Sequence, residues 1–225
     1  MTIKAVVFDL DDTLYDELDY IRSGLRIVAE YLTERFNWSL NDLNRQLLQS
    51  LEVSRNHVVD RVLTQKGVWS ECLMRDCDKV YREHIPNIRL SHHTKRLLKR
   101  ISKDYALFVV TAGDVEVQKN KLDVLGLSMS SNFEGFYSID KSASDYHKSL
   151  QSSIKSIANL TACRYENMVY ISNQYNEDFS IIQELGIITI ILQDSTADIN
   201  LFENIEPADY SAASLEAAIS LVSEI

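Results

Sequence analysis

Two acidic side chains near the start of the chain have the type and spacing needed to hold a cation. Asp9 and Asp11 follow the apolar run IKAVVF at residues 3–8, which predicts a buried strand. In an extended segment, residues two apart point to the same side, so their carboxylates repel unless a divalent cation or a shared proton holds them. Mg²⁺ prefers such oxygen ligands and leaves room for water and a substrate phosphate. An acidic turn is the alternative that these residues leave open.

A hydroxyl side chain occupies the equivalent place after a second apolar run. Residues 105–110 (YALFVV) predict a strand, and Thr111 and Ala112 follow it before a helix predicted over 115–125. A hydroxyl beside a flexible turn and a helix start suits an anion. Taken alone, the same pattern also describes an ordinary strand-to-helix turn in which Asp114 caps the helix.

A sheet of parallel strands would bring these strand ends together. Short apolar runs predict strands over 3–8, 105–110, 134–139, 168–172, 187–192 and 208–211. Helical spacing alternates with them over 92–102, 115–125, 143–158, 177–185 and 214–224. This alternation predicts an α/β fold with a Rossmann-like parallel sheet that carries helices on both faces. Ligands of such sheets bind beyond the carboxyl ends of the strands.

A helical block interrupts this alternation after the first strand. Residues 15–90 show helical spacing over 16–35, 41–51, 56–65 and 70–84, with Asn41 as a plausible cap, and no strand-like alternation. We therefore expect an all-α subdomain over 15–90, inserted into an α/β core domain formed by 1–14 and 91–225.

The segment FDLDDTL at residues 8–14 resembles the Asp-x-Asp-x-Thr signature of the haloacid dehalogenase-like (HAD) hydrolases. The resemblance implies that Asp9 is a nucleophile that forms an aspartyl-phosphate. It implies that Asp11 is the general acid/base, which protonates the leaving oxygen and then activates water. The Leu10 carbonyl would join the Asp9 and Asp11 side chains as Mg²⁺ ligands from this segment. A metal would also offset the repulsion between a carboxylate and a phosphoryl group.

The resemblance extends to the second and third motifs of the family. It implies that Thr111 hydrogen-bonds the transferring phosphoryl group, with help from the Ala112 backbone N–H. The family lysine that neutralises the phosphoryl group has two candidates, Lys141 after the strand predicted over 134–139 and Lys148 inside the following helix. We prefer Lys141, because a loop lysine before the helix can point into the cleft at the strand ends.

The fourth motif departs from the family pattern. The segment ISNQYNED at residues 171–178 has Asn173 where the family usually places its first acid, while Asp178 keeps the second position. Asn173 offers a neutral carbonyl ligand, or holds a metal-bound water, but brings no charge. Asp178 then becomes the main carboxylate ligand from this loop, and the alternative is an Asx turn in which it caps the next helix.

The helical block lies where one branch of the family carries a cap that closes over the cleft and selects the leaving group. Arg22 in this block would grip a second anionic group of the substrate. Dehalogenases of the family generally lack an acid at the position of Asp11, so this residue favours phosphate chemistry. We expect a Mg²⁺-dependent phosphomonoester hydrolase acting on a small phosphorylated metabolite, either a sugar phosphate or a nucleotide. Asn173 motivates the alternative, a catalytically weak relative that binds a phosphorylated ligand or partner in a regulatory role.

The charge balance and the cysteine content limit the classes of binding partner and the compartment that we expect. The 225 residues include 23 Lys and Arg against 33 Asp and Glu, a formal net charge of −10. Such a balance disfavours non-specific binding to nucleic acid or to an anionic membrane. The three cysteines, Cys72, Cys77 and Cys163, fit a reducing compartment better than a disulfide framework. We expect a cytoplasmic protein that is a monomer or a homodimer.

Overall fold

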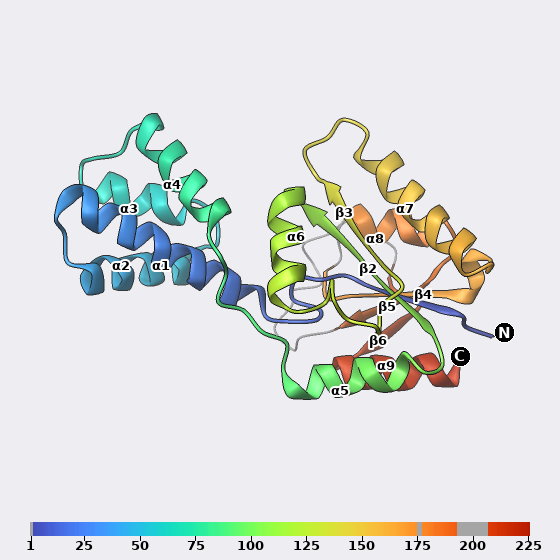
Figure 1. Cartoon of the computed structure of the whole chain (residues 1–225). Helices are drawn as coiled ribbons and strands as arrows, with labels where there is room; N and C mark the ends of the chain where they lie inside the picture. The colour runs from blue at the N-terminus through green and yellow to red at the C-terminus, as the bar shows by residue number, and fades with distance from the viewer. Residues whose placement is uncertain (1, 175–176, 193–206) are drawn as a thin grey trace. The chain divides into compact units, whose positions relative to one another are not determined.

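The chain divides into two compact units. A computed structural model describes residues 2–174, 177–192 and 207–225 (Figure 1). The core unit consists of Met1–Asp16 with Arg89–Ile225, and the helical unit consists of Glu17–Ile88. The units thus change after residues 16 and 88, where the sequence predicted changes after residues 14 and 90. Each unit is described by itself below.

The core unit contains a parallel β-sheet, as predicted. Its order is β3-β2-β1-β4-β5-β6, and every pair of neighbouring strands is parallel. The strands are β1 (Ala5–Phe8), β2 (Ala106–Gly113), β3 (Gly135–Asp140), β4 (Met168–Ser172), β5 (Ile188–Leu192) and β6 (Tyr210–Ala212). All residues of β1 and β4 are buried, which explains why their sequences are continuously apolar rather than alternating.

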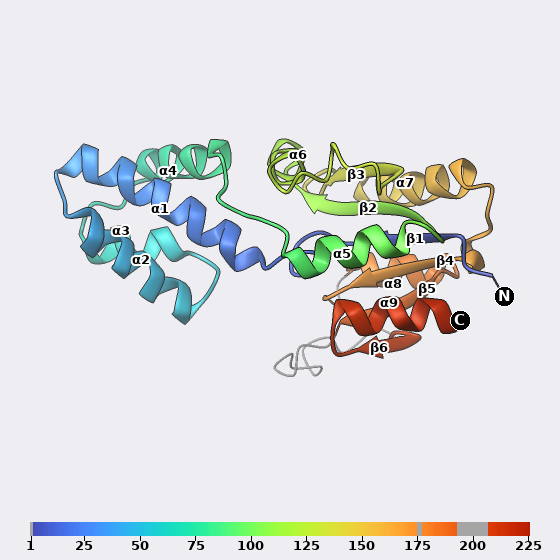
Figure 2. The ribbon, with the colours of Figure 1, turned by 60° about the horizontal axis from the view of Figure 1, so that its bottom comes forward.

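Helices cover both faces of this sheet (Figures 1 and 2). They are α5 (His92–Ile101), α6 (Val115–Val124), α7 (Tyr146–Leu160), α8 (Glu177–Glu184) and α9 (Leu215–Glu224), and a 3₁₀ turn lies at Tyr165–Asn167. Side chains of α7 and α8 share one apolar cluster with alternate residues of β1, β2 and β4. Helices α5 and α9 pack against each other, and α6 packs against β2 and β3. The predicted α/β architecture is confirmed.

The strand order fixes where a ligand site belongs. Connections from β1 lead through β2 to β3 on one side, whereas β4, β5 and β6 lie on the other side. The order therefore reverses between β1 and β4, and in open parallel sheets the crevice beyond the carboxyl ends at this reversal is where ligands bind. Asp9 follows β1 and Asn173 follows β4, so both lie at this point.

The helical unit has its own apolar core. It comprises α1 (Glu17–Phe36), α2 (Leu40–Val53), α3 (Val58–Gln65) and α4 (Glu71–Glu83), whose buried side chains form one cluster. Cys77 lies in this cluster, and its burial raises the pKa of the thiol to about 12. Among the described residues, no helix combines the length and apolar character needed to cross a membrane.

Two local predictions were wrong. The cap of α2 is Ser39, whose hydroxyl accepts from the Asp42 N–H, and Asn41 lies inside the helix. The strand predicted to end at residue 110 continues to Gly113, because β3 pairs with it in register from Phe108 to Gly113. Asp114 caps α6, as the alternative interpretation of this turn expects, since its carboxylate accepts from the N–H groups of Glu116 and Val117.

Candidate active site

Asp9 joins the ends of the two central strands. Its backbone N–H donates to the Ile171 carbonyl at 3.0 Å, which continues the pairing of β1 with β4 beyond Phe8. Its carboxylate accepts from the Leu10 N–H at 2.7 Å on one oxygen and from the Ser172 hydroxyl at 3.4 Å on the other. The carboxylate predicted as nucleophile is therefore oriented by groups from both strand ends.

A tight turn follows Asp9 and connects it to the end of β4. The Leu10 carbonyl accepts from the Leu14 N–H at 3.0 Å, and Asp12 adopts a left-handed conformation with φ 55°, which aspartate tolerates better than most residues. The turn places Thr13 so that its hydroxyl accepts from the Asn173 N–H at 3.1 Å. The first and fourth predicted motifs are thus hydrogen-bonded to each other.

Asp11 faces a ring of hydrogen-bond donors. The Lys121 ammonium lies 2.9 Å from one carboxylate oxygen and 2.8 Å from the other. The Tyr15 hydroxyl donates at 2.5 Å and the Gln118 amide at 3.0 Å. The ion pair is largely buried, with side-chain exposures of 4% for Lys121 and 17% for Asp11. Charge-assisted hydrogen bonds of this kind are the stronger class, so the carboxylate is firmly held.

Thr111 is buried inside β2, opposite Ser138 of β3, and not in a loop after the strand. The amide nitrogen of Gln118 lies 2.5 Å from its hydroxyl oxygen, and the same nitrogen contacts Asp11. Ala112 follows in β2, opposite Ile139. The structure therefore connects Thr111 to Asp11 through one side chain of α6.

Gln118 and Lys121 are not among the predicted site residues, although the sequence carries a signal for them. The buried face of α6 consists of Gln118, Lys121 and Leu122, followed by Leu125 at its C-cap. These positions have the spacing i, i+3, i+4 and i+7, which marks one face of a helix. Two polar residues on an otherwise apolar stripe, in the helix that follows Thr111, point to polar partners inside the core unit.

The two candidate lysines lie on the β3 side of the sheet. Lys141 is exposed in the turn after β3, and Lys148 is exposed in the first turn of α7. Beside Lys141, the Asp140 carboxylate accepts from the Ser142 hydroxyl at 2.7 Å and the Ser142 N–H at 2.8 Å. These hydrogen bonds lower the pKa of Asp140 below its usual value. The choice between the two lysines stays a prediction.

A family comparison decides the identity of this arrangement. Residues 6–192 match the family described as haloacid dehalogenase-like hydrolase, a span that includes the ends of β1, β2, β3 and β4. The chain belongs to this family. The resemblance inferred from FDLDDTL at residues 8–14 is confirmed, and the protein is a HAD-family hydrolase.

Individual relatives cover almost the whole chain. Glyceraldehyde 3-phosphate phosphatase of Methanocaldococcus jannaschii is 24% identical over 233 residues, with 99% of this chain and 98% of the relative covered. Among solved structures, the magnesium-bound HAD-hydrolase YfnB from Bacillus subtilis has a TM-score of 0.66 at 19% identity, covering 99% of both chains. A 2-haloacid dehalogenase from Pseudomonas syringae pv. Tomato DC3000 has a TM-score of 0.63 at 16% identity, also covering 99% of both. The solved relatives show the shared fold and include both a magnesium-bound hydrolase and a dehalogenase.

The oxygen atoms at the carboxyl ends of β1 and β4 in this HAD hydrolase are of the type that Mg²⁺ prefers as ligands. The Asp9 carboxylate and the Asn173 amide are hard oxygen ligands on two connected segments, whereas the predicted ligand Leu10 has a carbonyl that already accepts from the Thr13 and Leu14 N–H groups. Within the described residues, no three His, Cys, Asp or Glu side chains gather closely enough to hold an ion alone. Mg²⁺ usually takes only one or two carboxylates and keeps several waters. Asp178 lies in the first turn of α8, and its side chain is outside the described residues.

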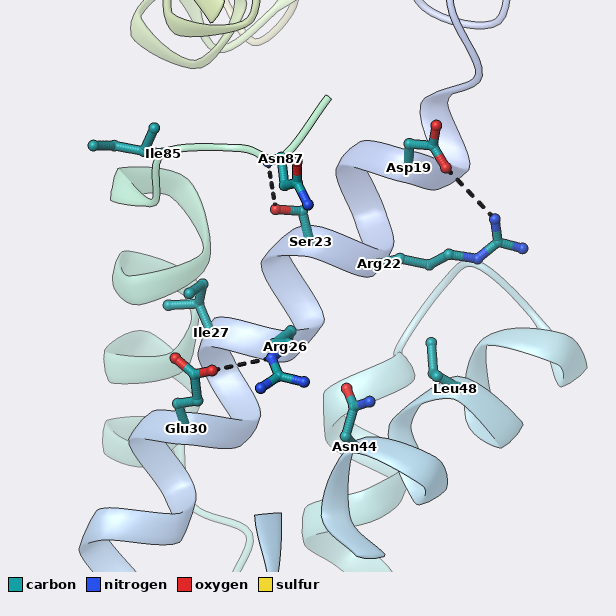
Figure 3. Close-up of a pocket in the computed structure, with 10 residues that line it drawn as sticks. All are labelled: Asp19, Arg22, Ser23, Arg26, Ile27, Glu30, Asn44, Leu48, Ile85 and Asn87. Carbon is teal, nitrogen blue, oxygen red and sulfur yellow. Dashed lines mark hydrogen bonds and ion pairs between the residues drawn. The ribbon is translucent and has the colours of Figure 1, made fainter. Parts of the chain in front are cut away.

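Arg22, the predicted substrate-binding residue of the helical unit, lies on α1 beside a hollow of about 510 Å³ (Figure 3). It is ion-paired with Asp19 at 3.7 Å, and both side chains are about half exposed. Arg26, one turn later, pairs with Glu30 at 3.1 Å. Asn44 and Leu48 of α2 line the same hollow. Binding of an anionic substrate group by Arg22 stays a prediction.

Proposed function

We propose that this HAD-family hydrolase is a Mg²⁺-dependent phosphatase that cleaves small phosphomonoesters through an aspartyl-phosphate on Asp9. The observation that carries the proposal is the held carboxylate of Asp11. It lies two residues beyond Asp9 and is connected through Gln118 to Thr111, the predicted phosphoryl-binding hydroxyl. Phosphoryl transfer to a carboxylate needs an acid/base beside the nucleophile, and Asp11 supplies one.

The residues divide the reaction into two steps. In the first, an Asp9 carboxylate oxygen forms a bond to phosphorus while the bond to the leaving oxygen breaks, and Asp11, after it has taken up a proton from solvent, gives that proton to the leaving oxygen. In the second, Asp11 takes a proton from water as the water oxygen attacks phosphorus, which releases phosphate and restores the Asp9 carboxylate. Thr111 and the predicted lysine orient and neutralise the phosphoryl oxygens. Bound Mg²⁺ supplies charge neutralisation between the carboxylate and the phosphoryl group.

Two observations support a small phosphorylated metabolite as the substrate. The Methanocaldococcus relative carries the name of a three-carbon sugar phosphate phosphatase and matches over 99% of this chain. The net charge of −10 makes a small phosphorylated metabolite a better substrate than a polyanion. We therefore include glyceraldehyde 3-phosphate among the first substrates to test, with other sugar phosphates and nucleotides beside it.

Phosphate release from a panel of esters tests the proposal. The panel holds glyceraldehyde 3-phosphate, other sugar phosphates, nucleotides and p-nitrophenyl phosphate, each with Mg²⁺ and with a chelator. We expect release with Mg²⁺ and a loss of roughly 100-fold or more with chelator, because the metal stabilises charge in the transition state. Release that is unaffected by chelation contradicts the metal requirement.

Asn173 supports a second candidate function, a weakly catalytic protein that binds a phosphorylated ligand or partner. A neutral amide at this place brings less charge to the metal than the usual acid. Thermal unfolding with Mg²⁺ plus beryllium fluoride separates the two functions, because a ligand that binds only the folded state raises Tm. A protein that is silent on the whole panel, and whose Tm does not respond, favours the second function.

The two lysines give a paired prediction. Lys141→Ala is expected to lower kcat/KM at least about 100-fold, because it removes a positive charge from the phosphoryl oxygens, whereas Lys148→Ala should lower it less than about threefold. Both residues are exposed, so both variants should keep the wild-type Tm within a few degrees. Steady-state kinetics on the best panel substrate measure the difference. Equal and mild effects mean that neither residue is the motif lysine, and the reverse order assigns the role to Lys148.

A further inference from the structure

Two polar side chains of α6 are buried in the core unit. Gln118 is 2% exposed and Lys121 is 3% exposed. Lysine is almost never fully buried unless it is paired, and replacement of a buried ion pair by apolar residues is often neutral or stabilising. A contribution to stability therefore does not account for a lysine at position 121. The residue with which Lys121 is paired indicates a second role.

That partner is Asp11, and the contacts fix its orientation. Lys121 reaches both carboxylate oxygens, at 2.9 and 2.8 Å, and lies 110 residues away in sequence. The Gln118 amide nitrogen has two hydrogens, and its two acceptors are an oxygen of Asp11 and the hydroxyl of Thr111. The Tyr15 hydroxyl, four residues after Asp11 in the sequence, also donates to the Asp11 carboxylate. Donors on both oxygens therefore hold the plane of the Asp11 carboxylate.

We propose that Lys121 and Gln118 are positioning residues that hold Asp11 in a fixed relation to Thr111 for proton transfer. The inference rests on the proposed function, in which Asp11 exchanges the proton and Thr111 binds the phosphoryl group. One rigid helix then sets the geometry between the proton donor and the phosphoryl group. Proton transfer requires heavy atoms within hydrogen-bond reach, and a misplacement of about 1 Å lowers rates roughly 100-fold.

The leaving group gives this role a distinct kinetic signature. In the first step an alkoxide is a poor leaving group, so an alkyl phosphate needs the proton of Asp11 as its phosphorus–oxygen bond breaks. A p-nitrophenolate leaves as the stable anion and needs that proton far less. A misplaced Asp11 therefore slows alkyl esters more than aryl esters, whereas general damage to the site slows both alike. The constant kcat/KM reports this step, because it covers events up to formation of the aspartyl-phosphate.

Lys121→Met tests the proposal, with p-nitrophenyl phosphate and the alkyl phosphate of the panel that the wild type hydrolyses fastest. We expect kcat/KM to fall about 100-fold or more for the alkyl ester and less than about 10-fold for the aryl ester. The matched control is Lys119→Met, which removes the same charge from an exposed position on the same helix. Its kcat/KM should stay within about twofold of the wild type for both esters.

Gln118→Met keeps the test decisive if Lys121→Met does not fold. It removes the link between Asp11 and Thr111 without leaving the acid unpaired, and the same selective loss on the alkyl ester is expected. Equal losses on both esters, no loss on either, or failure of both variants to fold overturn the positioning role, because each assigns the pair to structure alone. A wild type that hydrolyses neither ester overturns the proposed function itself, so the two failures are distinguishable.

Discussion

Asp9→Asn is expected to lower phosphate release by roughly 10⁴-fold or more while the fold is retained. An amide has no charge and is a poor nucleophile toward phosphorus, so no aspartyl-phosphate forms. The new side chain has the same shape, and its oxygen can still accept from the Leu10 N–H. The backbone bond from residue 9 to Ile171 is unchanged. The measurement is phosphate release with Mg²⁺, alongside thermal unfolding to show that the protein is folded.

Asp104→Asn provides the matched control, because it makes the same substitution at an exposed acid just before β2. Its activity and Tm should equal those of the wild type, since surface substitutions away from special features change stability by about 0.5 kcal/mol or less. Wild-type turnover by Asp9→Asn would remove the nucleophile assignment. Loss of activity with a large fall in Tm would instead show that the substitution acts on the fold.

Local patterns of apolar residues were enough to predict the strands of the sheet and the helices that cover it. β1 and β4 are fully buried, and a buried parallel strand is an uninterrupted apolar run that is easy to recognise. The helices predicted over 115–125 and 177–185 are followed by Gly126 and Gly186, whose φ values of 70° and 78° suit glycine. The ends of elements were less predictable. Ser39 and Asn41 are both good capping residues, and the sequence does not show which one meets a free N–H.

The site residues that were predicted are placed by local sequence patterns, whereas those that were missed are placed by tertiary packing. Asp9, Asp11 and Thr111 follow apolar runs, so their place at the sheet edge depends only on the strands being parallel. Lys121 meets Asp11 across 110 positions of sequence, and its role depends on how α6 packs against β2 and β3. Because most lysines are exposed, the sequence alone does not indicate that this one is buried beside an acid. The extension of β2 to Gly113 has the same origin, since the partner strand β3 decides where β2 ends.

Asp11→Asn is expected to separate the two steps of the reaction. The variant cannot take a proton from water, so hydrolysis of the aspartyl-phosphate slows by roughly 10²- to 10⁴-fold. p-Nitrophenolate leaves without a proton, so the first step survives better, and a burst of about one p-nitrophenolate per protein should precede slow turnover. Stopped-flow absorbance records the burst, and mass spectrometry of the quenched protein locates the added phosphoryl group on Asp9.

The substitution is close to isosteric, but its NH2 group replaces an oxygen that accepts from Lys121 and it leaves this buried ammonium without its charged partner, so thermal unfolding is measured beside the kinetics to show that the variant is folded. An alkyl phosphate should give no burst, because its leaving oxygen requires the missing proton, and this contrast is the internal control. Steady-state activity equal to that of the wild type would exclude Asp11 as the acid/base. A strong loss on both esters without a burst would contradict the prediction, because the first step would then need Asp11 even when the leaving group needs no proton. Because Asp9→Asn removes both the burst and the turnover whereas Asp11→Asn keeps the burst, the two variants together distinguish the nucleophile from the proton carrier.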